Sequence, residues 1–178
     1  MTGSTRVRAT LLLAIALAPG ASLMAQGTLE RIADRNEFRT GYRTDARPLS
    51  FEKDGKAQGY SVDFCQRIAV AVREHLQLPD MKVTFVPVSS DGRFDAVVDG
   101  DIDIECGATT VTLGRLERVD FTLMTFVTGG TILSMAANRV AHLEDLAGKR
   151  VAVVRGTSTA DALEAALKEK LIDRKSVV

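Results

Sequence analysis

The chain has 178 residues, of which 46% are hydrophobic and 26% are charged, and its formal net charge is zero at pH 7. This composition is typical of a globular protein and excludes a disordered chain, and the length suffices for one domain or two small lobes. The balanced charge and the lack of a basic run speak against a nucleic-acid partner or an anionic membrane surface.

The first 25 residues have the pattern of a secretory signal peptide. Arg6 and Arg8 precede an apolar run over residues 9–18, and small residues then lead to a cleavage position after Ala25. The run is too short to span a bilayer. We therefore predict a signal peptide over residues 1–25 and a protein exported to the periplasm.

Hydrophobic periodicity predicts alternating strands and helices after the signal. Asp54 and Gly55 predict a hairpin turn, and Ser61 is expected to cap the longest helix. The predicted elements are a short helix (29–36), a strand (37–42), a hairpin (51–60), a helix (61–76), a strand (81–87), a helix (93–99) and a strand (102–105). This order is typical of an α/β fold with a parallel sheet and helices on both faces.

A flexible glycine pair, Gly129 and Gly130, follows these elements. We interpret residues 127–130 as the crossing between two lobes, with lobe 1 over residues 26–128 and a partial lobe 2 over residues 129–178. The elements predicted beyond the crossing are a strand (131–136), a helical turn (143–148), a buried strand (149–154) and a helix (160–170). Residues 173–178 match no pattern.

Residues 102–115 contain a candidate site for a small anion. Their sequence predicts a strand, an exposed loop of small residues, and a helical turn that ends in Arg115. The loop offers backbone N–H groups and threonine hydroxyls, and an arginine fork fits a carboxylate through two parallel hydrogen bonds. A similar strand, glycine, threonine and helix unit follows near Thr157, so two helix N-termini could face one cleft. The alternative is an ordinary turn with a solvated arginine.

The two cysteines allow two interpretations. In an oxidising compartment Cys65 and Cys106 could form a disulfide. The helical pattern around Cys65 instead favours a buried free thiol, because nothing in the sequence shows that the two side chains are close. We predict the free thiol.

An acidic cluster between Asp95 and Glu105 could suggest a divalent cation site. Its spacing does not match a calcium-binding loop, so we interpret these residues as a solvated face. The chain also lacks the Cys and His spacing of a zinc site. We expect no metal, no cofactor and no catalytic residue.

Five motifs, in order, resemble a known family. They are G-Y-R (41–43), G-Y-S-V-D-F (59–64), D-I-E-C-G-A-T-T (103–110), R-L-E-R-V-D-F-T (115–122) and L-E-D-L-A-G-K-R-V-A-V-V-R-G-T-S (143–158). Together they resemble the periplasmic solute-binding proteins of polar amino-acid ABC importers, and most of all the glutamate/aspartate-binding branch. The resemblance implies a two-lobe periplasmic-binding-protein fold of type II and a monomeric, non-enzymatic receptor. Its partners would be the membrane subunits of an ABC permease.

The resemblance implies how the site would hold the α-carbon end of an amino acid. Arg115, with the backbone and hydroxyl groups of Thr110 and Thr157, would hold the α-carboxylate. The Ala108 carbonyl and the Thr110 hydroxyl would accept from the α-ammonium. The branch often has serine at position 108, so a side-chain hydroxyl is missing here.

The resemblance assigns the other end of the ligand to Arg43, Ser90 and Arg93. These residues match the positions that grip a side-chain carboxylate, and they imply L-glutamate or L-aspartate. An acidic amino acid needs two separate donor clusters, and arginine reads a carboxylate by shape as well as by charge. Because Arg43, Arg93 and Arg115 are expected near one sheet edge, we predict that they converge. The alternative for each is a solvated surface charge.

The family resemblance also implies a longer chain, in which the second lobe is completed and the chain returns to the first. We therefore expect a truncated or frameshifted reading frame, with lobe 1 nearly complete and lobe 2 truncated. The aspartate that would neutralise the ligand ammonium would lie in the absent part. Three alternative functions remain open: an enzyme of the cyclohexadienyl dehydratase type on the same fold, a non-functional fragment, and a sensory module of a larger receptor.

Overall fold

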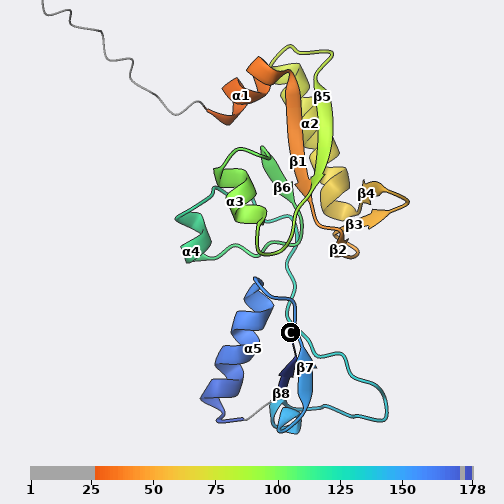
Figure 1. Ribbon diagram of the computed structural model, residues 1–178, viewed down its shortest axis with the longest axis vertical. Helices are drawn as coiled ribbons and strands as arrows, with labels where there is room; N and C mark the ends of the chain where they lie inside the picture. Colours follow the sequence, from red (N-terminus) through yellow and green to blue (C-terminus); the bar gives the residue numbers. More distant parts are fainter. Residues whose placement is uncertain (1–26, 173–174, 178) are drawn as a thin grey trace, which may run out of the picture.

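The structure is a computed structural model that describes residues 27–172 and 175–177. Figure 1 shows two bodies joined by an extended segment. We call residues 28–122 the first region, residues 123–139 the connecting segment, and residues 140–172 with 175–177 the second region.

The first region contains α1 (Thr28–Arg35), β1 (Glu37–Tyr42), β2 (Asp45–Ala46), β3 (Ser50–Lys53), β4 (Lys56–Gln58), α2 (Tyr60–His75), β5 (Lys82–Pro87), α3 (Arg93–Val98), β6 (Ile104–Cys106) and α4 (Leu113–Leu116). The second region contains the 3-10 helix η1 (Leu143–Leu146), β7 (Arg150–Ala152), α5 (Ser158–Glu169) and β8 (Lys175–Val177). The order of elements in the first region follows the sequence prediction, which is confirmed to within a few residues at each end.

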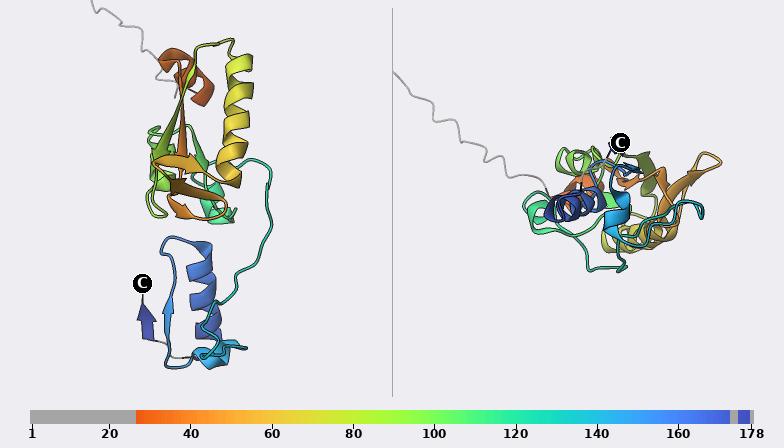
Figure 2. Two further views of the ribbon diagram at one scale, coloured as in Figure 1. Left: turned by 90° about the vertical axis from the view of Figure 1, so that its right-hand side faces the viewer. Right: turned by 90° about the horizontal axis from the view of Figure 1, so that it is seen from below.

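A parallel sheet with the strand order β5-β1-β6 organises the first region. Glu37 of β1 lies opposite Lys82 of β5, and Tyr42 lies opposite Cys106 of β6. Figure 2 shows α2 along one face of this sheet. Because the strands are parallel, their carboxyl ends share one edge, and this edge faces the second region (Figure 1). Open α/β sheets place their ligands at that edge.

The core of the first region forms where α1 and α2 pack against β1. Ile32, Phe38, Ala69 and Met81 are all at most 3% exposed and contact one another. Full burial of one large apolar side chain contributes about 1.5–3 kcal/mol. These contacts fix the sheet on which the candidate site lies.

Cys65 and Cys106 form a disulfide, so the predicted free thiol is wrong. Their Cα atoms lie 6.3 Å apart, although 41 positions separate them in the chain. The sequence pattern predicts which element each cysteine lies in. It does not predict that the middle of α2 packs against the end of β6. The bond therefore ties the longest helix to the strand that leads into the candidate anion loop.

A second contact anchors the same loop. Helix α2 begins at Tyr60 with Gly59 as its N-cap, so the predicted capping role of Ser61 is wrong. The Ser61 hydroxyl donates instead to the carbonyl oxygen of Gly107, at 2.8 Å. The loop after β6 is thus held to α2 by a covalent bond and a hydrogen bond on adjacent residues.

The connecting segment leaves the first region beside α2. The Tyr60 hydroxyl donates to the Thr125 carbonyl oxygen at 2.9 Å, and the Phe126 ring lies 6.3 Å from the Tyr60 ring. The strand predicted over residues 131–136 is wrong: these residues have no regular structure, and Leu133 is 97% exposed. Apolar residues of this kind favour a strand only when a neighbouring strand pairs with them.

The second region contains a parallel pair of strands, in which Arg150 of β7 lies opposite Lys175 of β8. The sequence pattern did not predict β8. After β7 the chain turns into α5, whose N-terminal end points toward the first region (Figures 1 and 2). Within the described residues, no helix combines the length and apolar character needed to cross a membrane. The predicted signal peptide, residues 1–25, lies outside the described part.

Candidate ligand-binding site

Arg93 is buried at the carboxyl edge of the sheet, where it is the first residue of α3 and is only 2% exposed. Its Nε donates to Oγ1 of Thr109 at 2.8 Å, and its Nη2 donates to the carbonyl oxygen of Gly156 at 3.2 Å. Its Nη1 is buried without a hydrogen-bond partner among the described residues. Burial lowers the pKa of Arg93, and the nearby Glu105 opposes that change. A buried guanidinium with a donor left over is suited to an anionic ligand.

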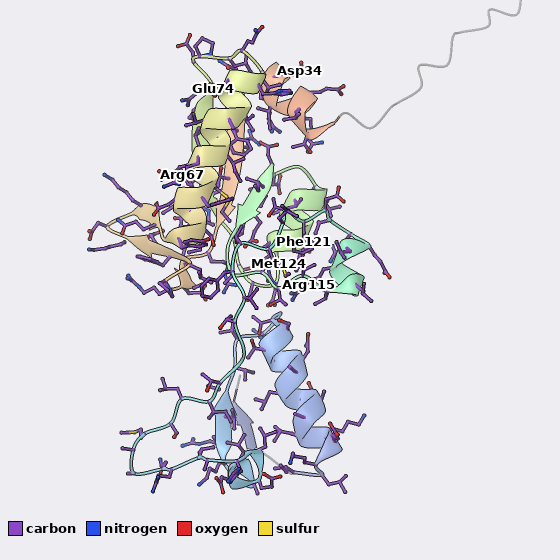
Figure 3. All side chains as sticks on the ribbon, turned by 180° about the vertical axis from the view of Figure 1, so that it is seen from behind. Asp34, Arg67, Glu74, Arg115, Phe121 and Met124 are labelled. Atoms are coloured by element: carbon purple, nitrogen blue, oxygen red, sulfur yellow. A yellow bond between two sulfur atoms is a disulfide. The ribbon has the colours of Figure 1, made fainter. Side chains whose placement is uncertain are left out.

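Arg115 approaches the same point from α4. Its Nη1 donates to the carbonyl oxygen of Thr110 at 2.7 Å, and its Nη2 reaches the Gly156 carbonyl oxygen at 3.4 Å. Both guanidinium groups lie over the ring of Phe94, with Arg93 at 4.5 Å and Arg115 at 5.1 Å from the ring centre. Figure 3 shows Arg115 at the end of the first region that faces the start of α5. The shared ring holds the two cations side by side.

The loop before α5 completes this cluster from the second region. Its Gly156 carbonyl accepts hydrogen bonds from Arg93 and from Arg115, so two guanidinium groups converge on one oxygen atom. The Ser158 hydroxyl also donates to Oγ1 of Thr110 at 2.9 Å. Gly156 has a φ of +66°, a conformation that favours glycine. The geometry shows that an oxygen acceptor fits between the two arginines.

Arg43 follows β1 and is 7% exposed. Its backbone N–H donates to Oγ of Ser50 at 2.9 Å, and its Nη2 pairs with Oδ1 of Asp45 at 2.7 Å. A Cβ on Gly107 would lie 3.1 Å from Cγ of Arg43, which places the arginine against the start of the anion loop. The structure therefore brings Arg43 beside the cluster, but its guanidinium already has a carboxylate partner.

The remaining predicted residues surround the arginines. Ser90 is half-buried in the loop before α3, and its carbonyl oxygen lies 3.1 Å from the place that a Cβ on Gly156 would take. Ala108 is exposed in the loop after β6. Thr157 caps α5: its Oγ1 accepts from the Ala160 N–H at 3.3 Å and donates to the Val154 carbonyl at 2.7 Å. The Thr157 hydroxyl is thus already occupied.

Asp103, just before β6, and Glu105 on β6 correct the interpretation of a solvated acidic face. The Asp103 carboxylate is fully buried and pairs with Nη2 of Arg35 at 2.6 Å. Oε1 of Glu105 is buried without a hydrogen-bond partner in the described part of the chain. Burial raises the pKa of Glu105, while a hydrogen bond from Thr109 lowers it. The predicted fold already indicated this burial, because strands of a parallel sheet with helices on both faces are buried on both sides.

Sequence reasoning also missed three residues that position the arginines or the loop beside them. Thr109 accepts from Arg93, Phe94 lies under both guanidinium groups, and Ser61 fixes the Gly107 carbonyl. Next to them is a hollow of about 190 Å³ that Arg93, Glu105 and Phe64 help to line. Serine, threonine and phenylalanine are common residue types, and no sequence motif predicts these supporting roles.

Comparison with known proteins identifies the family. Residues 38–174 match the model of the bacterial extracellular solute-binding proteins, family 3. The chain belongs to this family. Among its solute-binding relatives, the L-glutamate/L-aspartate-binding protein of Pseudomonas aeruginosa is 36% identical over 141 residues, which cover 78% of this chain and 47% of the relative. The glutamate/aspartate import solute-binding protein of Escherichia coli K12 is 32% identical over 161 residues, which cover 86% and 53%. The chain spans about half the length of these curated relatives.

Solved structures of binding proteins agree with this family. An ancestral amino acid-binding protein, described as a precursor of cyclohexadienyl dehydratase, matches with a TM-score of 0.70 at 28% identity, covering 85% of this chain and 65% of that chain. An ancestral arginine-binding protein bound to arginine matches with a TM-score of 0.68 at 29% identity, covering 80% and 61%. The predicted α/β fold of the periplasmic binding proteins is confirmed by these matches.

Proposed function

We propose that this solute-binding protein captures an acidic amino acid, L-glutamate or L-aspartate, and delivers it to an ABC importer. One observation carries the proposal: the guanidinium groups of Arg93 and Arg115 converge on a single oxygen atom at the edge where the sheet presents its strand ends. A carboxylate carries a full negative charge and binds a guanidinium group more strongly than a peptide carbonyl does, so a ligand with one carboxylate for each arginine would take the place of the Gly156 carbonyl.

The charges around the site favour an anion over a cation. Arg93 is buried within range of the charges of Arg115 and Arg43. A ligand with a net positive charge would meet these three cations at low dielectric, where like charges repel strongly. A ligand with two carboxylates would relieve this repulsion. The names of the glutamate/aspartate-binding relatives support the same ligand class.

In the proposed complex, Arg115, the backbone and hydroxyl groups of Thr110 and the backbone N–H of Thr157 bind the α-carboxylate, because the Thr157 hydroxyl is already occupied. The Ala108 carbonyl and the Thr110 hydroxyl accept from the α-ammonium. Arg43, Ser90 and Arg93 bind the side-chain carboxylate. For Arg43 this requires that its guanidinium bind both the ligand and Asp45, whose side chain is exposed.

We place the boundary between the lobes at residues 128 and 129, inside the connecting segment. Ligand contacts with both lobes would shift the population toward a closed form. The closed form would be the one presented to the permease, and the predicted signal peptide places the protein in the periplasm. The contacts of Gly156 and Ser158 with the first region support such a closure.

A second candidate function is an enzyme of the cyclohexadienyl dehydratase type. The observation that favours it is Glu105, a carboxyl group beside the arginine cluster whose pKa burial raises. A general acid needs a raised pKa of this kind. The likeness to a binding protein described as a precursor of that enzyme points the same way.

A thermal-shift screen with amino acids, run beside a prephenate turnover assay, separates the two functions. We expect L-glutamate and L-aspartate to raise the unfolding temperature of the protein, L-arginine to leave it unchanged, and prephenate to persist. Stabilisation grows with ligand excess over Kd, by about 2.7 kcal/mol at a hundredfold excess. Unchanged unfolding temperatures with both acidic amino acids would overturn the proposed receptor, and prephenate consumption would establish the enzyme.

A further inference from the structure

Glu105 lies at the middle of β6, where it lines the same hollow as Arg93 of the arginine cluster. A Cβ on Gly107 would collide with Oε1 of Glu105 and would come within 3.1 Å of Cγ of Arg43. The Glu105 carboxylate and the stem of Arg43 therefore meet in the space that glycine leaves open. Oε1 is buried, and within the described residues it accepts no hydrogen bond.

The charges that face Glu105 come from several elements. The positive charges of Arg43, which follows β1, and Arg93, on α3, attract the Glu105 carboxylate, so both stabilise its charged form. Arg115 of α4 and Asp91 of the loop before α3 act on Arg93. The neighbouring acid just before β6, Asp103, lines the same hollow, and its charge is matched by Arg35.

We propose that the site binds a carboxylate ligand together with a proton, and that Glu105 is the residue that takes up this proton. Glu105 is then a positioning residue, because its negative charge balances Arg43 and Arg93 until the ligand replaces it as their counter-ion. This inference rests on the proposed function, since it requires an anionic ligand at the arginines.

The physical reason is competition between two negative charges for the same cations. A ligand carboxylate that binds Arg93 brings a second anion next to Glu105, and like charges in one site raise the pKa of the weaker acid. Burial already raises the pKa of Glu105 above its ordinary value of 4.5. Ligand binding raises it further, so the complex holds more protons than the free protein and affinity falls as pH rises.

Calorimetric titration of the whole chain with L-glutamate measures the proton directly. The titration is repeated in buffers of different ionisation enthalpy between about pH 5 and pH 8, where the ligand's own carboxylates stay charged. We expect uptake of up to one proton and a loss of affinity of up to about tenfold per pH unit. Binding with no proton uptake at any pH in this range overturns the inference and leaves the proposed function intact. If neither L-glutamate nor L-aspartate binds, both fall together.

Substitution identifies the residue. E105Q keeps the shape but cannot titrate, so we expect its affinity for L-glutamate to be independent of pH and to exceed that of the wild type at high pH. The matched control is D91N, which removes an exposed acid that also acts on Arg93. D91N should keep the wild-type slope. An equal slope in wild type and E105Q overturns the assignment to Glu105.

A ligand-free measurement keeps the assignment testable. Because the folded-state pKa of Glu105 is raised, its contribution to the free energy of unfolding falls as pH rises above 4.5. The unfolding temperature of the wild type should therefore fall relative to that of E105Q as pH rises above 4.5. A constant difference between the two proteins would contradict a titrating Glu105.

Discussion

The first and second regions hold their parts of the proposed site in different ways. The first region fixes Arg93 and Arg115 with a packed core, a shared aromatic ring and a loop that the Cys65–Cys106 disulfide anchors. The second region reaches the same point through a backbone carbonyl, that of Gly156, and a single hydroxyl. It buries few large side chains, and the connecting segment that leads to it is exposed.

This difference suggests that the two regions control two different properties, the choice of ligand and the closure of the regions around it. The arginines of the proposed site all come from the first region, so we expect that region to set the choice of ligand. The second region contributes only uncharged groups, and two of its three hydrogen bonds to the first region are exposed. We therefore expect these contacts to set how firmly the two regions close on a ligand. Changes in the first region should accordingly have the larger effects.

The largest effect is expected from R93A. This change removes a buried guanidinium with two hydrogen bonds, and truncating one partner of a buried charged pair costs about 2–5 kcal/mol. We expect the affinity for L-glutamate to fall at least about a hundredfold in calorimetric titrations. R118A is the control, because Arg118 is exposed and pairs with Asp95. If R93A binds L-glutamate as well as R118A does, Arg93 does not hold the ligand.

The next effect is on stability. Replacing Cys65 and Cys106 together by serine removes the only covalent link between α2 and β6 in the described chain. Loss of a native disulfide typically costs about 2–5 kcal/mol. Denaturant unfolding should show this loss in the oxidised wild type against the double variant, and reductant should lower the wild type to the same level. Equal midpoints in all three samples would show that the bond does not stabilise the first region.

Two glycines sharpen the comparison between the regions. G107A places a Cβ against the buried Glu105 carboxylate, whereas G156A places one against the carboxylate of Asp91, which is exposed and can move away. For G107A the cost is that of overpacking a buried site, about 1–3 kcal/mol. For G156A it is that of a non-glycine residue at positive φ, about 1–2 kcal/mol. We expect G107A to lose more L-glutamate affinity than G156A, and G114A, which meets open space, to lose none. The reverse order of the two variants would place the critical surface in the second region.

The smallest effect is expected from S158A. It deletes the hydroxyl that bridges the second region to Thr110, an exposed hydrogen bond of 2.9 Å. Such a bond contributes about 0.5–1.5 kcal/mol, so the affinity should fall between about twofold and tenfold. T159A, on the adjacent residue of α5, should bind like the wild type. A loss with S158A as large as that with R93A would contradict the division of roles.

The sequence predicted local features better than contacts between elements. The strand that ends just before Arg43 and the helix that begins at Arg93 followed from hydrophobic periodicity, because burial imposes a pattern along the chain. The Cys65–Cys106 bond did not follow, since nothing in either segment records which element packs against it. The strand predicted over residues 131–136 failed for the same reason, because its apolar residues find no pairing strand.

Within the proposed site, the family resemblance predicts the ligand contacts, while the residues that support them came only from the structure. Phe94 and Thr109 are common residue types whose roles depend on where Arg93 points. The charge of Glu105 by itself predicts a solvated face, whereas the burial that a parallel strand imposes predicts the buried position that it takes. Charge patterns along a chain therefore identify candidate ligand contacts more readily than they identify the groups that position them.

The central claim is that two separate donor clusters bind the two carboxylates of one acidic amino acid. Calorimetric titration of the wild-type protein with L-glutamate, L-glutamine and L-isoglutamine tests it most directly, because each amide replaces one carboxylate without changing the size of the ligand. We predict that L-glutamate binds most tightly and that either amide loses at least about tenfold in affinity, or about 1.4 kcal/mol. Equal affinities for L-glutamate and both amides would contradict the claim.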